Sequence, residues 1–146
     1  MQRLFFSFLL LTSTSSFADG FVLDNGKKFI TFGANVGYSF LGENPQSFFG
    51  LHSSYWVSQD AGNLVGGKLG IEIREGKLPY FTLGAQSGFG LGGATWDLIL
   101  HPEEIWGTQF GIWANVFLGA NLRVRYMNEL TIDPNLYLTV PSPLNN

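Results

Sequence analysis

Hydrophobic and polar residues alternate along most of this chain, from residue 28 to about residue 126. The clearest segment is 29–40, where every even position is apolar and every odd position after the first is polar or small. Side chains of a β-strand point alternately to opposite faces, so this period of two residues predicts strands with one apolar face and one polar face. We find no convincing helical period. The pattern therefore predicts an all-β chain.

Turn-forming residues divide the alternating region into eight predicted strands. Clusters such as Gly42-Glu43-Asn44-Pro45 and Glu75-Gly76-Lys77 interrupt the alternation, and we also expect turns at 119–121 and 133–135. The predicted strands cover, in order, about 29–40, 47–58, 64–74, 79–90, 94–100, 106–118, 122–131 and 136–140. Six to ten strands are compatible with these signals, because sequence sets strand ends poorly. We predict an up-and-down antiparallel β-barrel of about eight strands.

The first residues have the layout of a secretory signal peptide. Arg3 precedes an apolar run at 4–11 that only Ser7 interrupts, and Ser16-Phe17-Ala18 places small residues at the −3 and −1 positions of a cleavage site. A short membrane anchor is the alternative, but the run is well below the roughly 20 residues that a spanning helix needs. We therefore expect four parts: a cleaved signal peptide at 1–18, a periplasmic segment at 19–27, the barrel at 28–140 and a tail at 141–146.

Composition narrows the class of protein. Cleavage after Ala18 would remove only Arg3 from the charged residues, which leaves seven Lys and Arg against eleven Asp and Glu. The chain has no basic run that would favour nucleic acid, and it has no cysteine for a disulfide or a zinc–thiolate site. Charged residues make up 13% of the chain, against about 25% in ordinary soluble domains. If the chain crosses a membrane, it must do so as a closed barrel, because lipid leaves open strand edges unpaired.

Alternation does not by itself say which face lies inside a barrel. A soluble barrel hides its apolar face, whereas a membrane barrel turns that face to lipid. The predicted polar face carries few charges for a solvated exterior, and the two signs are nearly balanced, as in a narrow lumen where charges must pair. These predicted lumen charges are Lys68, Glu72, Arg74, Asp97, Arg123, Arg125 and Glu129.

Glycine and aromatic residues favour the same orientation. Eight glycines fall on the polar face, where they would relieve crowding inside a small barrel; they are Gly33, Gly37, Gly50, Gly66, Gly70, Gly84, Gly88 and Gly111. Aromatic residues of the apolar face form two expected girdles near opposite strand ends, as at a bilayer interface. One girdle comprises Phe40, Phe49, Phe81 and Trp106, and the other comprises Tyr55, Phe89 and Trp96.

Segments such as 32–38 and 80–85 resemble strands of the small eight-stranded bacterial outer-membrane barrels, the class that includes the OmpA transmembrane domain, OmpX and OmpW. The resemblance covers about residues 28–140 and rests on patterning rather than on a motif. It implies a transmembrane barrel in a Gram-negative outer membrane, with membrane lipids as its partners. Two features depart from the class: the chain does not end on a strand with a terminal aromatic residue, and its loops are short on both sides.

Candidate chemistry on the polar face is limited. His52 and Ser54 share one strand face, which suggests a nucleophile and a base, but residues i and i+2 lie about 6–7 Å apart along a strand and no third catalytic group accompanies them. We therefore interpret both as polar lumen residues and expect no enzyme, no cofactor and no metal site. The expected polar lumen residues are His52, Ser54, Gln86, Gln109 and Asn115, while His101 is expected in a turn.

Three functional hypotheses follow from these patterns. The first is an outer-membrane barrel with a structural role, its lumen filled by salt bridges, or with a narrow polar passage in which Arg123 and Arg125 set a weak anion preference. The second is a soluble periplasmic or secreted barrel that binds a small apolar ligand among Phe, Ile and Leu side chains. The third is a barrel that forms homo-oligomers through its apolar face.

Overall fold

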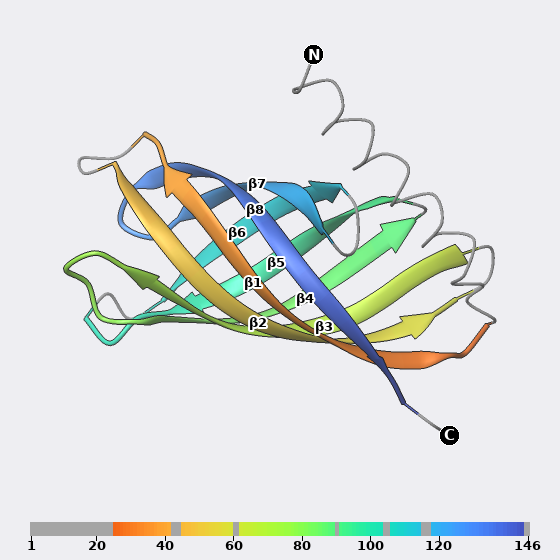
Figure 1. Cartoon of the computed structure of the whole chain (residues 1–146). Helices are drawn as coiled ribbons and strands as arrows, with labels where there is room; N and C mark the ends of the chain where they lie inside the picture. The colour runs from red at the N-terminus through yellow and green to blue at the C-terminus, as the bar shows by residue number, and fades with distance from the viewer. Residues whose placement is uncertain are drawn as a thin grey trace, which may run out of the picture.

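Eight antiparallel strands form a closed barrel in the computed structural model of this chain (Figure 1), which confirms the predicted fold class and strand number. The structure describes residues 25–41, 45–59, 62–89, 91–103, 106–114 and 118–144, and the predicted signal peptide lies outside these ranges. The strands are β1 (Lys28–Ser39), β2 (Gln46–Ser58), β3 (Asn63–Arg74), β4 (Tyr80–Phe89), β5 (Gly92–Leu100), β6 (Gly107–Ala114), β7 (Leu118–Tyr126) and β8 (Leu130–Pro143). Within the described residues, no helix is long and apolar enough to cross a membrane.

Each strand pairs with its neighbours in sequence, and β8 pairs with β1 to close the barrel. The start of β1 and the end of β8 therefore lie side by side, with Phe29 opposite Pro143. The three connections at this end, which we call the terminal end, span two to four residues, whereas the four at the opposite, loop end span three to six. Glu75-Gly76-Lys77 lies in a loop-end turn as predicted, and Gly76 there has the positive φ of 69° that glycine adopts without strain.

Strand register fixes the size of the barrel. Tracing paired residues once around the wall from Thr31 leads to position 41, just past the end of β1 and one step beyond the Phe40–Ile132 bridge, ten residues farther along the chain. The path passes through Ser54, Lys68, Gly84, Asp97, Gln109, Arg125 and Thr131. A stagger of this kind goes with strands tilted by about 35–45° and with an interior just wide enough for side chains to fill.

The apolar strand faces lie outside and the polar faces lie inside. Leu69, Leu83 and Leu138, in the middle of three different strands, have exposed fractions of 61%, 53% and 54%. Glu72 and Asp97, in contrast, are almost completely buried in the interior. Most Phe, Leu and Ile side chains of the apolar faces therefore lie on the outside of the barrel.

Two predicted turns are wrong. Residues 119–121 lie within β7, where Gly119 leaves room for the hydroxyl group of Tyr137, 2.7 Å from where a Cβ would stand. Residues 133–135 lie within β8, where the side chains of Asp133 and Asn135 point inward and are buried. The small residues in these segments fit the limited space inside the barrel, and the polar ones fit its polar interior. The chain does not reverse at either place.

The last strand is longer than predicted. β8 begins at Leu130 instead of 136, and it continues through Pro141 and Ser142 to Pro143, past the expected end of the barrel at 140. The Leu144 backbone N–H still donates to the Lys28 carbonyl, with an N–O distance of 3.2 Å. Much of the tail expected at 141–146 therefore belongs to the barrel wall, because β1 residues as far as Phe29 pair with it.

Candidate functional site

Six of the seven predicted lumen charges lie inside the barrel. Lys68, Glu72, Arg74, Asp97, Arg123 and Arg125 come from β3, β5 and β7, and their side chains are at most 11% exposed. Glu129 is the exception. Its prediction assumed that the alternation of β7 continues, but β7 ends at Tyr126, so Glu129 lies exposed in the turn before β8.

Glu72 lies at the centre of a cluster of arginines. One carboxylate oxygen, Oε1, accepts from Arg74 Nε at 2.8 Å and from Arg125 Nη2 at 2.6 Å. The other, Oε2, lies 2.8 Å from Arg123 Nη2. The two contacts to Oε1 are charge-assisted hydrogen bonds, and the Arg123 contact is an ion pair. One carboxylate thus holds three guanidinium groups, each of which would be costly to bury unpaired.

Asp133 is the second anion of this cluster, and the sequence interpretation missed it because Asp-Pro-Asn is a common turn sequence. Its Oδ2 accepts from Arg74 Nη2 at 2.7 Å, and its Oδ1 accepts from the Ser39 hydroxyl group at 2.6 Å. Arg125 Nε and Arg123 Nη2 are farther from Oδ2, at 3.4 and 3.6 Å. The alternation of side chains along β8 could have identified Asp133 as an interior residue, because it shares a face with Tyr137 and Thr139.

A second group of charges joins this cluster through Gln109. Lys68 Nζ lies 2.6 Å from Asp97 Oδ2, which also accepts from Gln109 Nε2 at 2.6 Å. Arg125 Nη2 donates to Gln109 Oε1 at 3.1 Å. Both ends of the Gln109 amide are therefore engaged. Its predicted place in the lumen is confirmed, and it connects the Lys68–Asp97 pair to the arginine cluster.

Two inward aromatic rings stack against the arginines near the loop end. The guanidinium carbon of Arg74 lies 5.1 Å from the ring centre of Phe48 and 5.5 Å from that of Tyr80. Arg123 lies 4.5 Å from the Phe48 ring centre and Arg125 lies 5.3 Å from that of Tyr80. Aromatic faces attract cations at such distances. The arginine side chains and these two rings thus form one filled layer across this part of the lumen.

His101 lies just beyond this layer, in the turn after β5 as predicted, yet it is buried. Its ring centre is 4.4 Å from that of Tyr80. The Glu103 backbone N–H donates to Nδ1 and Nε2 lies 3.2 Å from the Leu78 carbonyl oxygen, an arrangement that suits the tautomer protonated at Nε2. His101 thus ties two loop-end turns over the Tyr80 ring.

Apolar and aromatic side chains fill the lumen toward the terminal end. Trp56 lies between Phe29, with ring centres 6.2 Å apart, and Trp113, with ring centres 6.0 Å apart. Leu64 and Tyr137 complete this buried cluster. Trp56 Nε1 donates to Thr31 Oγ1 at 3.2 Å, and the Tyr137 hydroxyl group donates to the Ala114 carbonyl at 3.0 Å. The polar ends of these two aromatic residues are therefore satisfied.

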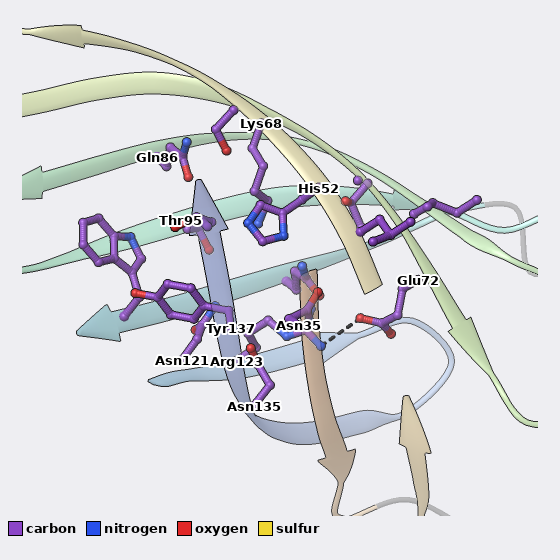
Figure 2. Close-up of a pocket in the computed structure, with 18 of the residues that line it drawn as sticks. Asn35, His52, Lys68, Glu72, Gln86, Thr95, Asn121, Arg123, Asn135 and Tyr137 are labelled. Carbon is purple, nitrogen blue, oxygen red and sulfur yellow. Dashed lines mark ion pairs between the residues drawn. The ribbon is translucent and has the colours of Figure 1, made fainter. Parts of the chain in front are cut away.

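A cavity of about 80 Å³, with many polar residues in its wall, lies between the two filled layers (Figure 2). Its wall includes the predicted lumen residues His52, Ser54, Gln86 and Gln109, whereas Asn115 lies outside the described residues. Figure 2 shows the His52 ring facing this space, with Gln86 and Thr95 to one side and the Arg123–Glu72 ion pair to the other. The volume has room for several water molecules.

His52 and Ser54 both point inward from β2 and border the cavity. The Nε2 atom of His52 stands over Gly33, 2.6 Å from where a Cβ would be. Ser54 is buried two residues nearer the terminal end, opposite Thr31 and Lys68. Their surroundings are those of polar wall residues. Within the described part of the chain, no group of three His, Cys, Asp or Glu side chains could hold a metal ion.

Inward glycines make room for the large interior side chains, as expected. A Cβ on Gly84 would overlap the Asp97 carboxylate, and one on Gly37 would overlap the Phe48 ring. The ring of Trp113 lies over Gly88, 2.7 Å from where a Cβ would be. A narrow barrel can therefore hold an ion cluster and several aromatic rings because the facing wall has no side chain at these points.

The predicted outer aromatics all lie exposed on the barrel surface, but one girdle is incomplete. Phe40, Phe49, Phe81 and Trp106 lie near the loop end as predicted, and Tyr55 and Phe89 lie near the terminal end. Trp96 is 53% exposed but is the fifth of the nine residues of β5. Its placement in a girdle is wrong, because β5 begins two residues before its predicted start.

Comparison with protein-family models and with curated protein sequences gives no match for this chain. The functional assignment therefore rests on the geometry of the barrel.

Proposed function

We propose that this protein is an integral outer-membrane β-barrel with a structural role, whose lumen is filled rather than open. The observation that carries the proposal is the distribution of polarity across the barrel wall. Apolar side chains of all eight strands are exposed outside, while seven ionisable side chains of the described residues lie inside. This is the arrangement of a protein whose outer solvent is lipid.

Strand length and surface aromatics support the same proposal. The strands have eight to fourteen residues, and a tilted strand needs about 9–11 residues to cross the hydrocarbon core. Tyr38, Phe40, Phe49, Phe81, Trp106 and Tyr126 are exposed toward the loop end, where an aromatic belt would meet the membrane interface. In water the same exterior would present an apolar surface far larger than soluble monomers tolerate. The predicted signal peptide supports export.

The filled layers argue for a structural role rather than for solute passage. Arg123 and Arg125, the residues expected to give a passage its anion preference, are held by Glu72 and by the Phe48 and Tyr80 rings. The Trp56–Trp113 cluster lies across the lumen on the other side of the cavity. A solute would have to displace both layers to cross.

Membrane fractionation with gel migration of heated and unheated protein tests this proposal. The mature protein should be in the outer-membrane fraction, and the unheated sample should migrate faster because a closed barrel stays compact in detergent. Recovery in the soluble periplasmic fraction, with no migration difference, would refute membrane insertion.

A narrow polar passage is the second candidate, and the cavity between the two layers is the observation that favours it. Liposome swelling in small sugars and salts separates the two functions. A structural barrel should give the swelling rate of protein-free liposomes, both unaltered and as Arg125→Glu. Swelling above that rate that changes with Arg125→Glu would establish passage.

A further inference from the structure

The ionised groups inside the barrel do not balance. Among the described residues, four cationic side chains, Lys68, Arg74, Arg123 and Arg125, share the lumen with three anionic ones, Glu72, Asp97 and Asp133. With all seven ionised, these described groups carry one net positive charge. A net charge buried away from water is unfavourable unless a counter-charge accompanies it. The Phe48 and Tyr80 rings reduce this cost without removing the charge.

The cavity wall also holds buried N–H groups that have no acceptor. Gln86 Nε2, Trp113 Nε1 and Arg123 Nε form no hydrogen bond, although each of these side chains is more than 90% buried. They come from β4, β6 and β7 and line the same space. An N–H group buried without a partner is unfavourable, because it has lost its hydrogen bonds to water and gained none in return. Such a group is rare in a native interior unless something not part of the chain accepts from it.

We propose that this cavity is a binding site for a small oxyanion of carboxylate or nitrate size. The oxyanion supplies the missing negative charge, and its oxygens accept from Gln86, Trp113 and Arg123. Glu72 also borders the cavity, but both of its carboxylate oxygens are engaged by arginines, so it does not oppose the anion with a free charge.

Two further unpartnered atoms of the cavity wall are compatible with this ligand. The Thr95 hydroxyl group, also without a partner, can donate as well as accept. Asn121 presents an unpartnered Oδ1, and rotation of its amide by half a turn would present the N–H₂ group instead. The volume of about 80 Å³ restricts the ligand to a few heavy atoms. Large anions and lipid headgroups attached to their chains do not fit.

Nuclear magnetic resonance of the tryptophan indole groups tests the proposal directly. The chain has four tryptophans, so the indole N–H region contains four signals that can be assigned individually. The protein is refolded into detergent micelles in the presence of increasing sodium formate, which gives the ion access during folding. Formamide, a neutral compound of nearly the same size, and sodium gluconate, a carboxylate too large for the cavity, serve as matched controls.

Formate should shift the Trp113 indole signal in a saturable manner, whereas formamide and gluconate should not. Trp96 and Trp106, which are exposed on the outer surface, should not respond to any of the three. Equal shifts with formate and formamide would overturn the proposal in favour of a site for neutral polar molecules. No shift with formate would overturn it in favour of a cavity that holds water only.

One substitution and a control assign the donors. Gln86→Met keeps the length of the side chain but removes the N–H group, so it should raise the dissociation constant of formate by about tenfold or more. Thr131→Val is the control, because Thr131 is a buried lumen residue with an unpartnered hydroxyl group that does not border the cavity. It should leave the dissociation constant unchanged. Unaltered formate binding by Gln86→Met would contradict the proposed donor set.

Discussion

Replacement of Glu72 by Gln should be among the most damaging single changes in this barrel. Glutamine has nearly the same shape and can still accept hydrogen bonds, so the substitution removes charge with little change in packing. Three arginine nitrogens lie 2.6–2.8 Å from the Glu72 carboxylate, and Asp133 would be left as the sole carboxylate facing those three arginines within the described lumen. The net charge of the described lumen groups would rise from one positive charge to two.

Removing one partner from a buried ion pair costs about 3–5 kcal/mol, because the other partner stays buried without compensation. We expect at least this loss in the free energy of unfolding for Glu72→Gln. The assay is urea unfolding of the protein in lipid vesicles, followed by tryptophan fluorescence and by the gel migration of unheated samples. Glu75→Gln is the matched control, since Glu75 lies exposed in the adjacent turn and its replacement should change the free energy by less than about 0.5 kcal/mol.

A second substitution separates charge from shape. Arg123→Met in the Glu72→Gln background returns the lumen to one net positive charge, so the double variant should be more stable than the sum of the two single losses predicts. Equal stability of Glu72→Gln and Glu75→Gln would refute the reasoning that the lumen charges are buried and mutually dependent.

Three further predictions concern packing, the barrel exterior and the second anion. Gly84→Ala should destabilise the barrel by about 1–3 kcal/mol because the new Cβ overlaps the Asp97 carboxylate, whereas Gly67→Ala, with its nearest contact at 3.8 Å, should have little effect; equal unfolding midpoints in urea would contradict this. Leu83→Arg, in the middle of the exposed face of β4, should cost about 2–4 kcal/mol in vesicles, and a loss below about 0.5 kcal/mol would indicate that this face is not in lipid. Asp133→Asn should destabilise by about 3–5 kcal/mol in the same assay, and tolerance of the change would show that Asp133 is not needed to hold Arg74.

The sequence predicted the number of strands and the face to which most side chains point. Both depend on alternation, because alternate residues of a strand face the same side. This one rule places side chains as different as Lys68 and Gln86 inside the same barrel. Such a rule holds along a strand whatever the exact ends of the strand are. It therefore gave six of the seven interior charges correctly.

The ends of β7 and β8 could not be predicted for the same physical reason that Asp133 was missed. Gly-Ala-Asn and Asp-Pro-Asn favour turns in isolation, but here long-range contacts determine their conformation. Gly119 accommodates the Tyr137 hydroxyl group, and Asp133 accepts from Arg74 of β3, 59 residues away in sequence. The stacking of arginines on Phe48 and Tyr80 depends on the stagger of the closed barrel, which no local pattern encodes.

Quenching of tryptophan fluorescence by brominated lipids tests membrane insertion most directly. Two variants each retain one outer tryptophan, Trp96 in the middle of β5 or Trp106 at the loop end, with the other tryptophans replaced by Phe. Trp96 should be quenched most strongly by lipids brominated deep in the acyl chain, and Trp106 by lipids brominated near the headgroup. If bromine at either depth quenches neither tryptophan, the apolar exterior does not lie in a bilayer and the proposed membrane barrel is wrong.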